Sequence, residues 1–389
     1  MKRYVSRIAI LALLVCGACH SSDQYLDQDC QDKSRLAVSA VMEGSEEATG
    51  SSDYYKHDRF ILNRSIIRVV NTVNYSVPDF KEGEYYDYIY TEEGISWDNN
   101  QPNFRPLKAG TVFGDENRVD PEGGFDWDRI VPTSNAFIFE AACYPMKYVP
   151  FDAVATDQSD VEGFWSADLL LAHTRKPLNE RYELLKLKFW HVFSMIRIEL
   201  ELPVAESNAD SGFPESVPGD TDGDKRETVE SISLTGMYVT YNVRYAESIE
   251  SNASRTVVGT SDGGRQNISM YRLPGEDKVT VEENGRRYLN CVFAAIVPTQ
   301  QIRTQETLLE LRINTIVGFD GGMNTQKIVE KTYVFQPKTA IDMRQGHITV
   351  LKLTADEKSL NPVLLSAKVN PWSEAYTEVD LTPVSSSNP

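Results

Sequence analysis

Hydrophobic and polar residues alternate with a period of two along much of the chain, the pattern of strands that have one buried face. Residues 187–202 show it most clearly: apolar side chains fall on odd positions up to Phe193 and on even positions from Ile196. Because a strand cannot change phase without an extra residue, this shift predicts a bulge or short turn near residues 192–195. His191 stands among aromatic residues at this point, and we interpret it as a hydrogen-bonded core histidine.

Further alternating or β-branched segments predict strands in both halves of the chain. They are residues 36–42, 60–62, 66–75, 85–90, 137–145, 231–243, 278–282, 288–298, 308–317, 329–335, 347–353 and 367–372. Segments rich in Gly, Pro and charge separate them, above all 91–133 and 203–228. Because amphipathic helical periods are nearly absent, the sequence predicts an all-β protein built from two β-sandwiches.

The length of the chain also favours two domains. At 389 residues it exceeds the usual size of one hydrophobic core. The polar segment 174–183, which contains Pro177, is the preferred boundary. We therefore expect an N-terminal domain over residues 36–178 and a C-terminal domain over residues 179–384.

The first residues have the composition of an export signal. Basic residues precede an apolar run at residues 8–15, which is about half of the roughly 20 residues that a spanning helix needs. Such a segment is removed from the mature protein, so residues 1–18 are expected to be a signal peptide. The polar residues 19–35 then form a tether or pro-segment.

A cysteine stands at the expected end of this signal. Gly17-Ala18-Cys19 resembles the lipobox of bacterial lipoproteins, in which the cysteine is acylated and becomes the new N-terminus. A plain signal-peptidase site is the alternative, because Cys16 occupies the position where Leu is usual. The resemblance implies an exported protein that is anchored to the outer membrane by fatty acids such as palmitate on Cys19. Several acyl chains at ~0.8 kcal/mol per buried methylene give lasting attachment.

Charge excludes one large class of partners. The chain has 57 acidic and 39 basic residues, a net charge of −18 at pH 7. This charge opposes binding to phosphate backbones, so nucleic acid is excluded as a partner. Beyond the signal and Cys19, the cysteines are Cys30, Cys143 and Cys291, without the spacing of metal ligands. Cys143 and Cys291 lie in apolar runs typical of buried thiols, and one disulfide is the alternative in an exported protein.

No motif for catalysis, metal or cofactor binding is found. No two of the five histidines have the spacing of an H-E-x-x-H zinc motif, and the G-x-S-x-G elbow and the P-loop are absent. Residues 220–225 imitate the start of a calcium loop, but the sixth position is Lys225 and the twelfth is Ser231, so its glycine and bidentate glutamate are missing. We therefore predict no enzyme, no cofactor and no metal site.

Aromatic residues gather in the first half of the chain. They include residues 85–90 together with Trp97, Phe104, Phe125 and Trp127. Packing in a core or against loops is the favoured interpretation. A platform on which sugars stack is the alternative, and it would make the protein a surface lipoprotein that binds glycans through aromatic loops.

Several short motifs together resemble one known family. In chain order they are Leu36-Ala-Val-Ser-Ala40 after a basic residue, Asp168-Leu-Leu-Leu-Ala172, Leu187-x-Phe-x-His-x-x-Ser-x-Ile196, Tyr333-Val-Phe-Gln-Pro337, Val369-x-Pro-Trp372 and Val379-Asp-Leu381. They resemble the fimbrillin family, the subunits of type V pili of Gram-negative bacteria. Phe189-x-His191-x-x-Ser194 is the most specific of them.

The resemblance implies two transthyretin-like β-sandwich domains in tandem and a structural or adhesive role in a cell-surface fimbria. In polymerising members, a trypsin-like protease removes the first strand after a basic residue, and another subunit's terminal strand fills the groove. The candidate exchanged strand carries Leu36, Val38 and Val41, and the candidate cleavage sites are Arg35, Arg59, Arg64 and Arg68. Cutting at Arg35 would keep the strand, whereas cutting at any of the other three would remove it.

The implied partners are other fimbrial subunits through strand addition, the outer membrane through the lipid, and a ligand on a host or bacterial surface. The long segments 91–133 and 203–228 favour a minor, tip or anchor subunit, since a stalk subunit repeated many times gains little from such additions. Stalk, tip and anchor roles all stay open at this point.

Overall fold

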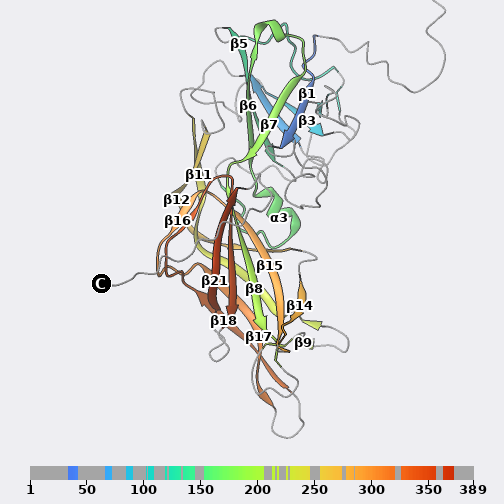
Figure 1. The fold of residues 1–389 in the computed structure, drawn as a ribbon. Helices are drawn as coiled ribbons and strands as arrows, with labels where there is room; N and C mark the ends of the chain where they lie inside the picture. Colours follow the sequence, from blue (N-terminus) through green and yellow to red (C-terminus); the bar gives the residue numbers. More distant parts are fainter. Residues whose placement is uncertain are drawn as a thin grey trace, which may run out of the picture.

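The fold is that of a computed structural model (Figure 1). It describes residues 34–42, 66–71, 85–90, 102, 104–108, 119–120, 122–132, 135–144, 153–205, 213–214, 217–218, 225–226, 228–245, 255–273, 277–283, 285–319, 326–355 and 362–371. The predicted signal peptide, Cys19, Cys30, Arg59, Arg64, Trp97 and residues 220–224 lie outside the described residues.

The described part of the chain is almost entirely β-structure, which confirms the all-β prediction. Its helical elements are α3 (Val161–Ser166) and the single 3₁₀ turn η4 (Leu178–Glu180). Asp160 caps α3, because its carboxylate accepts a hydrogen bond of 2.7 Å from the Gly163 N–H.

The N-terminal unit is a closed barrel. Its strands follow one another around the barrel in the order β1 (Val38–Met42), β4 (Phe104–Pro106), β3 (Tyr85–Tyr90), β2 (Ile66–Asn71), β5 (Ala136–Tyr144), β6 (Leu170–Pro177) and β7 (Leu185–His191). Parallel pairing between β1 and β7 closes it. The expected transthyretin-like sandwich is therefore not confirmed here, because the edges that a sandwich would leave open are joined to each other.

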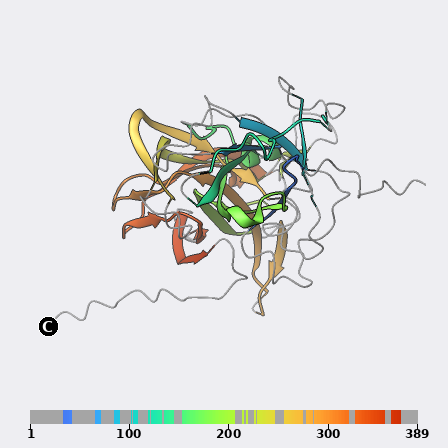
Figure 2. The same ribbon diagram turned by 90° about the horizontal axis from the view of Figure 1, so that it is seen from above.

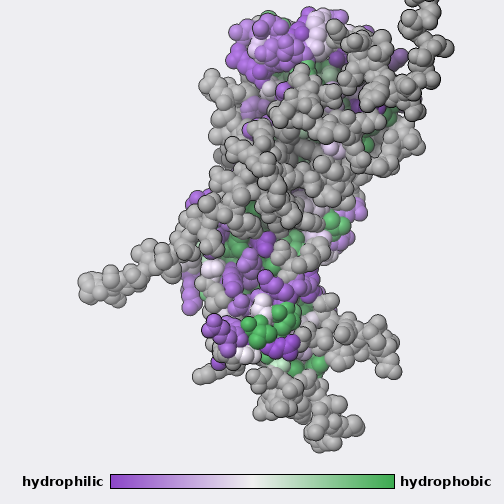
Figure 3. All heavy atoms as spheres, turned by 45° about the vertical axis from the view of Figure 1, so that its right-hand side comes forward, coloured by the Kyte–Doolittle hydropathy of each residue, from purple (hydrophilic) through white to green (hydrophobic). Residues whose placement is uncertain are grey.

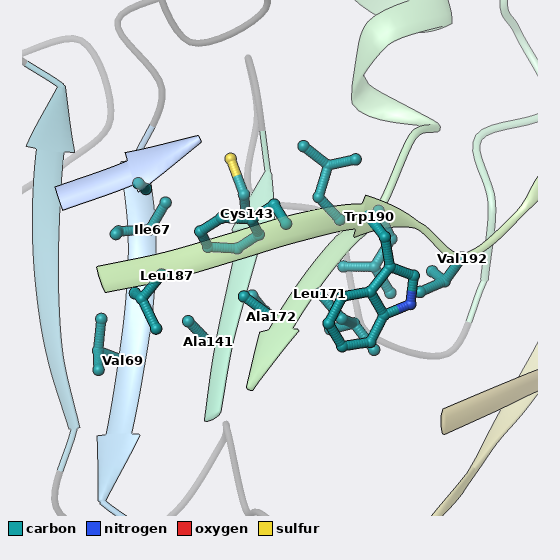
Figure 4. Close-up of a cluster of buried hydrophobic side chains, with 14 of the residues drawn as sticks. Ile67, Val69, Ala141, Cys143, Leu171, Ala172, Leu187, Trp190 and Val192 are labelled. Carbon is teal, nitrogen blue, oxygen red and sulfur yellow. The ribbon is translucent and has the colours of Figure 1, made fainter. Parts of the chain in front are cut away.

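Side chains from all around the barrel fill its interior. Ile67 and Val69 of β2 lie opposite Ala141 and Cys143 of β5, and Leu187 of β7 covers them (Figure 4). Cys143 is a fully buried free thiol, and so is Cys291 in the C-terminal unit, so the two do not form a disulfide with each other.

The C-terminal unit consists of two sheets that share a second hydrophobic core. One sheet has the order β13 (Tyr271–Arg272), β15 (Arg287–Val297), β8 (Ser194–Pro203), β20 (His347–Ala355) and β21 (Pro362–Pro371), with β14 (Lys278–Val281) also pairing with β15. The other has the order β12 (Arg255–Ser269), β11 (Val229–Tyr245), β17 (Leu309–Phe319) and β18 (Gln326–Phe335). Ile198 and Leu200 of β8 belong to the same core as Leu311 of β17.

Short strands complete this unit. They are β9 (Val217–Pro218) with β10 (Lys225–Arg226) and β16 (Gln300–Ile302) with β19 (Ile341–Met343). Seen from above, the barrel strands lie over the sheets of the C-terminal unit (Figure 2).

The chain passes from the barrel to the second unit at the predicted phase change. β7 ends at His191 and β8 begins at Ser194, so residues 192–193 form the break. Even-numbered Ile196, Ile198, Leu200 and Leu202 then face the C-terminal core, as predicted. Residues 179–191, which a boundary at 178 assigns to the C-terminal unit, include β7, and β7 belongs to the barrel because its parallel partner is β1.

His191 is a buried, hydrogen-bonded core residue, as the sequence predicts. Its side chain is 7% exposed, and Nδ1 lies 3.0 Å from the carboxylate of Asp168, which is fully buried. Asp168 stands just before β6, so this contact joins the start of β6 to the end of β7. Gly346 packs against the backbone here, because its N–H donates to the Phe193 carbonyl at 2.8 Å.

Replacing His191 with Ala should lower stability, because the buried Asp168 carboxylate loses this partner. We expect a loss of about 1 to 3 kcal/mol in the free energy of unfolding. Urea unfolding followed by tryptophan fluorescence measures it. An unchanged unfolding midpoint would show that the contact contributes nothing to the fold.

The segment before α3 ties the two units together. The Val154 N–H donates to the Val239 carbonyl at 2.8 Å, and the Ser269 N–H donates to the Thr156 carbonyl at 2.9 Å. The fully buried Gln158 adds a two-way contact across the joint: its Nε2 donates to the Ile296 carbonyl at 2.8 Å, and its Oε1 accepts from the Ile296 N–H at 2.8 Å. Phe164 of α3 stacks on Tyr271 at 5.2 Å. The joint thus has backbone, side-chain and aromatic contacts between the two units.

Replacing Gln158 with Leu should destabilise the joint, because both backbone groups of Ile296 lose their side-chain partner in a buried setting. The expected loss is about 1 to 3 kcal/mol for buried groups left unsatisfied. Gln301→Leu is the matched control, since Gln301 is exposed and its hydrogen bond of 2.6 Å to Asp342 is at the surface. Calorimetry that gives both variants the same melting temperature would contradict the role of Gln158.

Candidate functional site

β1 presents an apolar row to the barrel interior. Leu36, Val38 and Ala40 are 3%, 0% and 2% exposed, at the two-residue period of a strand. The sequence prediction included the first two residues of this row and missed Ala40. It named Val41 instead. Val41 pairs with Lys188 and has an odd number, whereas the inward row has even numbers.

The hydrogen bonding of β1 is unequal on its two sides. It runs parallel to β7 over its whole length, from Val38 opposite Leu185 to Met42 opposite Phe189. On the other side, one residue pair, Val38 with Phe104, connects it to β4. The strand is therefore held mainly by β7.

Backbone contacts at the start of β1 complete its attachment. The Leu36 N–H donates to the Phe125 carbonyl at 2.9 Å, and the Trp127 N–H donates to the Ser34 carbonyl at 2.7 Å. Arg35 forms an antiparallel bridge with Asp126 between these bonds. The bonds place residues 34–36 against the loop that carries Phe125 and Trp127.

Large apolar side chains on the neighbouring strands lie beside β1 and line the space that it occupies. Leu185, Leu187 and Phe189 of β7 are fully buried, and Phe104 of β4 is 2% exposed. Withdrawing β1 would uncover a groove between β4 and β7 with an apolar lining and unpaired backbone groups along β7. Such an edge is a template for another strand.

The arginines proposed for processing are not brought together by the fold. Arg68 lies inside β2, which pairs with β3 on one side and β5 on the other. Its guanidinium forms two hydrogen bonds of 2.8 and 2.9 Å with Asp87 and stacks 3.8 Å from the centre of the Tyr85 ring. Arg35 directly precedes the inward row of β1, and Arg59 and Arg64 lie outside the described residues. A protease needs an extended, unpaired segment, which Arg68 does not offer in the folded barrel.

β21 is the last strand of its sheet. It pairs with β20 from His347 opposite Pro371 to Ala355 opposite Pro362, and in the described part of the chain no strand pairs with its outer edge. Leu364 and Ala367 pack against the C-terminal core.

Four of the aromatic residues of the first half pack in the core, as the favoured interpretation predicts, whereas Tyr85 is exposed. Tyr88, Phe104, Phe125 and Trp127 are at most 2% exposed, and the Trp127 ring meets Phe137 edge-on at 5.2 Å. The Tyr88 hydroxyl accepts a hydrogen bond of 3.1 Å from the Phe125 N–H, and burial raises its pKa. These rings are not available as a sugar-stacking platform.

Two further findings concern the described residues alone. They contain no group of three or more His, Cys, Asp or Glu side chains that could hold a metal ion. None of the helices among them is long and apolar enough to cross a membrane.

Comparison with known proteins gives structural likenesses only. No protein-family model matches the chain, and no curated protein sequence matches it. A structure described as a candidate cell adhesion protein from Bacteroides uniformis shares 13% identity and covers 87% of this chain and 99% of that chain, with a TM-score of 0.42.

Two fimbrial structures show similar likenesses. A fimbrial protein from Bacteroides vulgatus shares 12% identity and covers 87% of this chain and 99% of that chain, with a TM-score of 0.37. The tip fimbrial protein Mfa3 from Porphyromonas gingivalis shares 8% identity and covers 80% of this chain and 94% of that chain, with a TM-score of 0.33. These three structures are described as adhesion and fimbrial proteins. With TM-scores below 0.5, the likenesses do not by themselves assign a function.

Proposed function

We propose that the protein is a structural and adhesive subunit of a cell-surface fimbria, and that subunits assemble by exchanging strands. The observation that carries this proposal is β1, a strand of five residues that closes the barrel while being fully paired with β7 alone. A closing strand of this kind can be exchanged for an equivalent strand without disturbing the order of the others.

The incoming strand has to meet the requirements that β1 meets now. It must be extended, run parallel to β7, and place apolar side chains at every second position beside Leu185, Leu187 and Phe189. Backbone hydrogen bonds then supply affinity, and the alternating side chains supply specificity. Each large side chain that becomes fully buried contributes about 1.5 to 3 kcal/mol.

The C-terminal end of the chain has the composition of such a donor. Residues 375–381 place Ala375, Val379 and Leu381 at odd positions, and the acidic residues Glu378 and Asp380 stand between them. This is the alternation of a half-buried strand. The segment follows β21, so in our proposal it leaves one subunit and lies in the β1 groove of the next.

Removal of β1 requires a cut between β1 and β2. Arg59 and Arg64 lie in that interval of the sequence, whereas Arg35 precedes the strand and Arg68 is paired within β2. We therefore assign processing to Arg59 or Arg64.

Controlled trypsin treatment of the purified chain tests strand exchange. The uncut protein should be a monomer, and the product cut between β1 and β2 should form oligomers or bind a synthetic peptide copying residues 372–384. A Lys56→Gln, Arg59→Gln, Arg64→Gln triple variant is the matched control, because trypsin cleaves after lysine as well as arginine and these are the basic residues between β1 and β2. It should stay monomeric under the same treatment. Size-exclusion chromatography, electron microscopy and peptide binding give the readouts.

A second peptide tests the role of the apolar row. The same peptide with Val379 and Leu381 replaced by Asp should not bind, because it would place charge against the apolar lining of the groove. A cleaved protein that stays monomeric, keeps its melting temperature and binds neither peptide would exclude strand exchange.

Within the fimbria we propose a minor, tip or anchor position and a lipid anchor at Cys19 in the outer membrane. The long segments 91–133 and 203–228 support the minor, tip or anchor position. The sequence Gly17-Ala18-Cys19 after an export signal supports the lipid anchor.

Replacing Cys19 with Ala should leave unprocessed precursor or release the protein from membranes, because no acyl chain can be attached. Membrane fractionation and mass spectrometry of the mature N-terminus measure this. An unmodified N-terminus at another residue of the native protein would contradict the anchor.

A further inference from the structure

β6 and β7 separate from each other over most of their length. Their ladder contains two residue pairs, Leu170 with His191 and Leu171 with Trp190. Beyond these pairs β6 continues along β5 and β7 continues along β1, and η4 with residues 181–184 connects them. A cavity of about 300 Å³ lies in this opening. Its polar lining residues are Thr174, Arg175, Lys176, Glu180, Glu183 and Lys186.

Lys176 is built into the wall of the cavity. Its side chain is 8% exposed although it lies on a strand, and Nζ donates to the Leu184 carbonyl at 3.2 Å. The same Nζ lies 3.4 Å from Glu180 and 3.7 Å from Glu183. A buried ammonium group is costly without such partners, and here they hold a charged group beside an open space. The wall of the cavity is therefore polar at Lys176.

The cavity has more positive than negative lining groups, although the chain as a whole is strongly acidic. Arg175, Lys176 and Lys186 supply three positive charges and Glu180 and Glu183 two negative charges, which leaves a net charge of +1. Arg175 is also held in place, because its Nη2 donates to Asn135 at 2.6 Å. A small concave site with cations in its wall concentrates anions.

We propose that this cavity binds a small hydroxylated carboxylate, namely an acidic sugar residue of a glycan. Arg175 and Lys186 bind the carboxylate through charge-assisted hydrogen bonds, and Glu180, Glu183 and Thr174 accept hydrogen bonds from hydroxyl groups. A cavity of about 300 Å³ is at the lower end of ligand pockets, which suits one sugar ring rather than an extended chain.

The position of the cavity fits contact with another surface. The β6–β7 connection lies at the end of the barrel that points away from the C-terminal unit (Figure 1). Hydrophilic side chains gather at this end (Figure 3). The inference names the class of ligand for the adhesive role proposed above, and it rests on that proposed function.

Ligand-observed NMR titration of the uncut protein tests the inference. The probes are glucuronic acid and N-acetylneuraminic acid, with glucose, the methyl ester of glucuronic acid and inorganic phosphate as comparators. At least one of the acids should bind saturably, and the uncharged comparators and phosphate should bind at least about tenfold more weakly, which corresponds to ~1.4 kcal/mol.

Variants locate the binding. Arg175→Gln and Lys186→Gln should each weaken binding of the acid by about tenfold or more, because each removes a charge-assisted hydrogen bond. Lys188→Gln is the matched control, since Lys188 lies two residues along β7 from Lys186 and does not line the cavity. It should leave binding unchanged.

Three results would overturn the inference: no saturable binding of either acid, equal binding of glucose, the ester or phosphate, or an equal loss in Lys188→Gln. None of these readouts depends on cleavage or on peptide capture. Failure here would leave strand exchange untouched, and failure of strand exchange would leave this site intact.

Discussion

The parallel pairing of β1 with β7 is the interaction on which the rest of the molecule depends. It closes the barrel, covers Leu185, Leu187 and Phe189, and brings residues 34–36 against the loop that carries Trp127. β1 and β2 are not neighbours in the barrel, since β4 and β3 stand between them. The strand that closes the barrel with a buried apolar face is thus the strand that we propose another subunit supplies.

The second constraint is the joint between the two units. Gln158 satisfies both backbone groups of Ile296, and the residues around it are hydrogen-bonded into sheets of the C-terminal unit. The joint is therefore not a linker in the ordinary sense, because part of the N-terminal chain is an element of the C-terminal fold. One hydrophobic cluster also includes both Phe164 and Ala294, so the two units share part of a core.

Sequence reasoning predicted what local patterns encode. The alternation up to Phe193 and from Ile196 located the break between β7 and β8, and the aromatic surroundings of His191 predicted its burial. The motif at residues 168–172 and the motif around His191 were both recognised, but only the fold shows that Asp168 and His191 contact each other. Long-range pairing, closure of the barrel and the cavity at Lys176 depend on which strands meet, and no local period encodes that.

The direction of β7 and β8 has a mechanical consequence. Two residues separate these strands, so β7 of the barrel and β8 of the C-terminal unit form one nearly continuous extended segment (Figure 1). β8 pairs in parallel with β20. Tension applied at the ends of a strand-exchanged filament would act along the strands, and the ladder bonds of β7 and β8 would be loaded in shear, all together. By contrast, a force that peels two strands apart from one end breaks their hydrogen bonds one at a time. In the proposed filament, the pairing with β7 would therefore make the incoming strand hard to pull out.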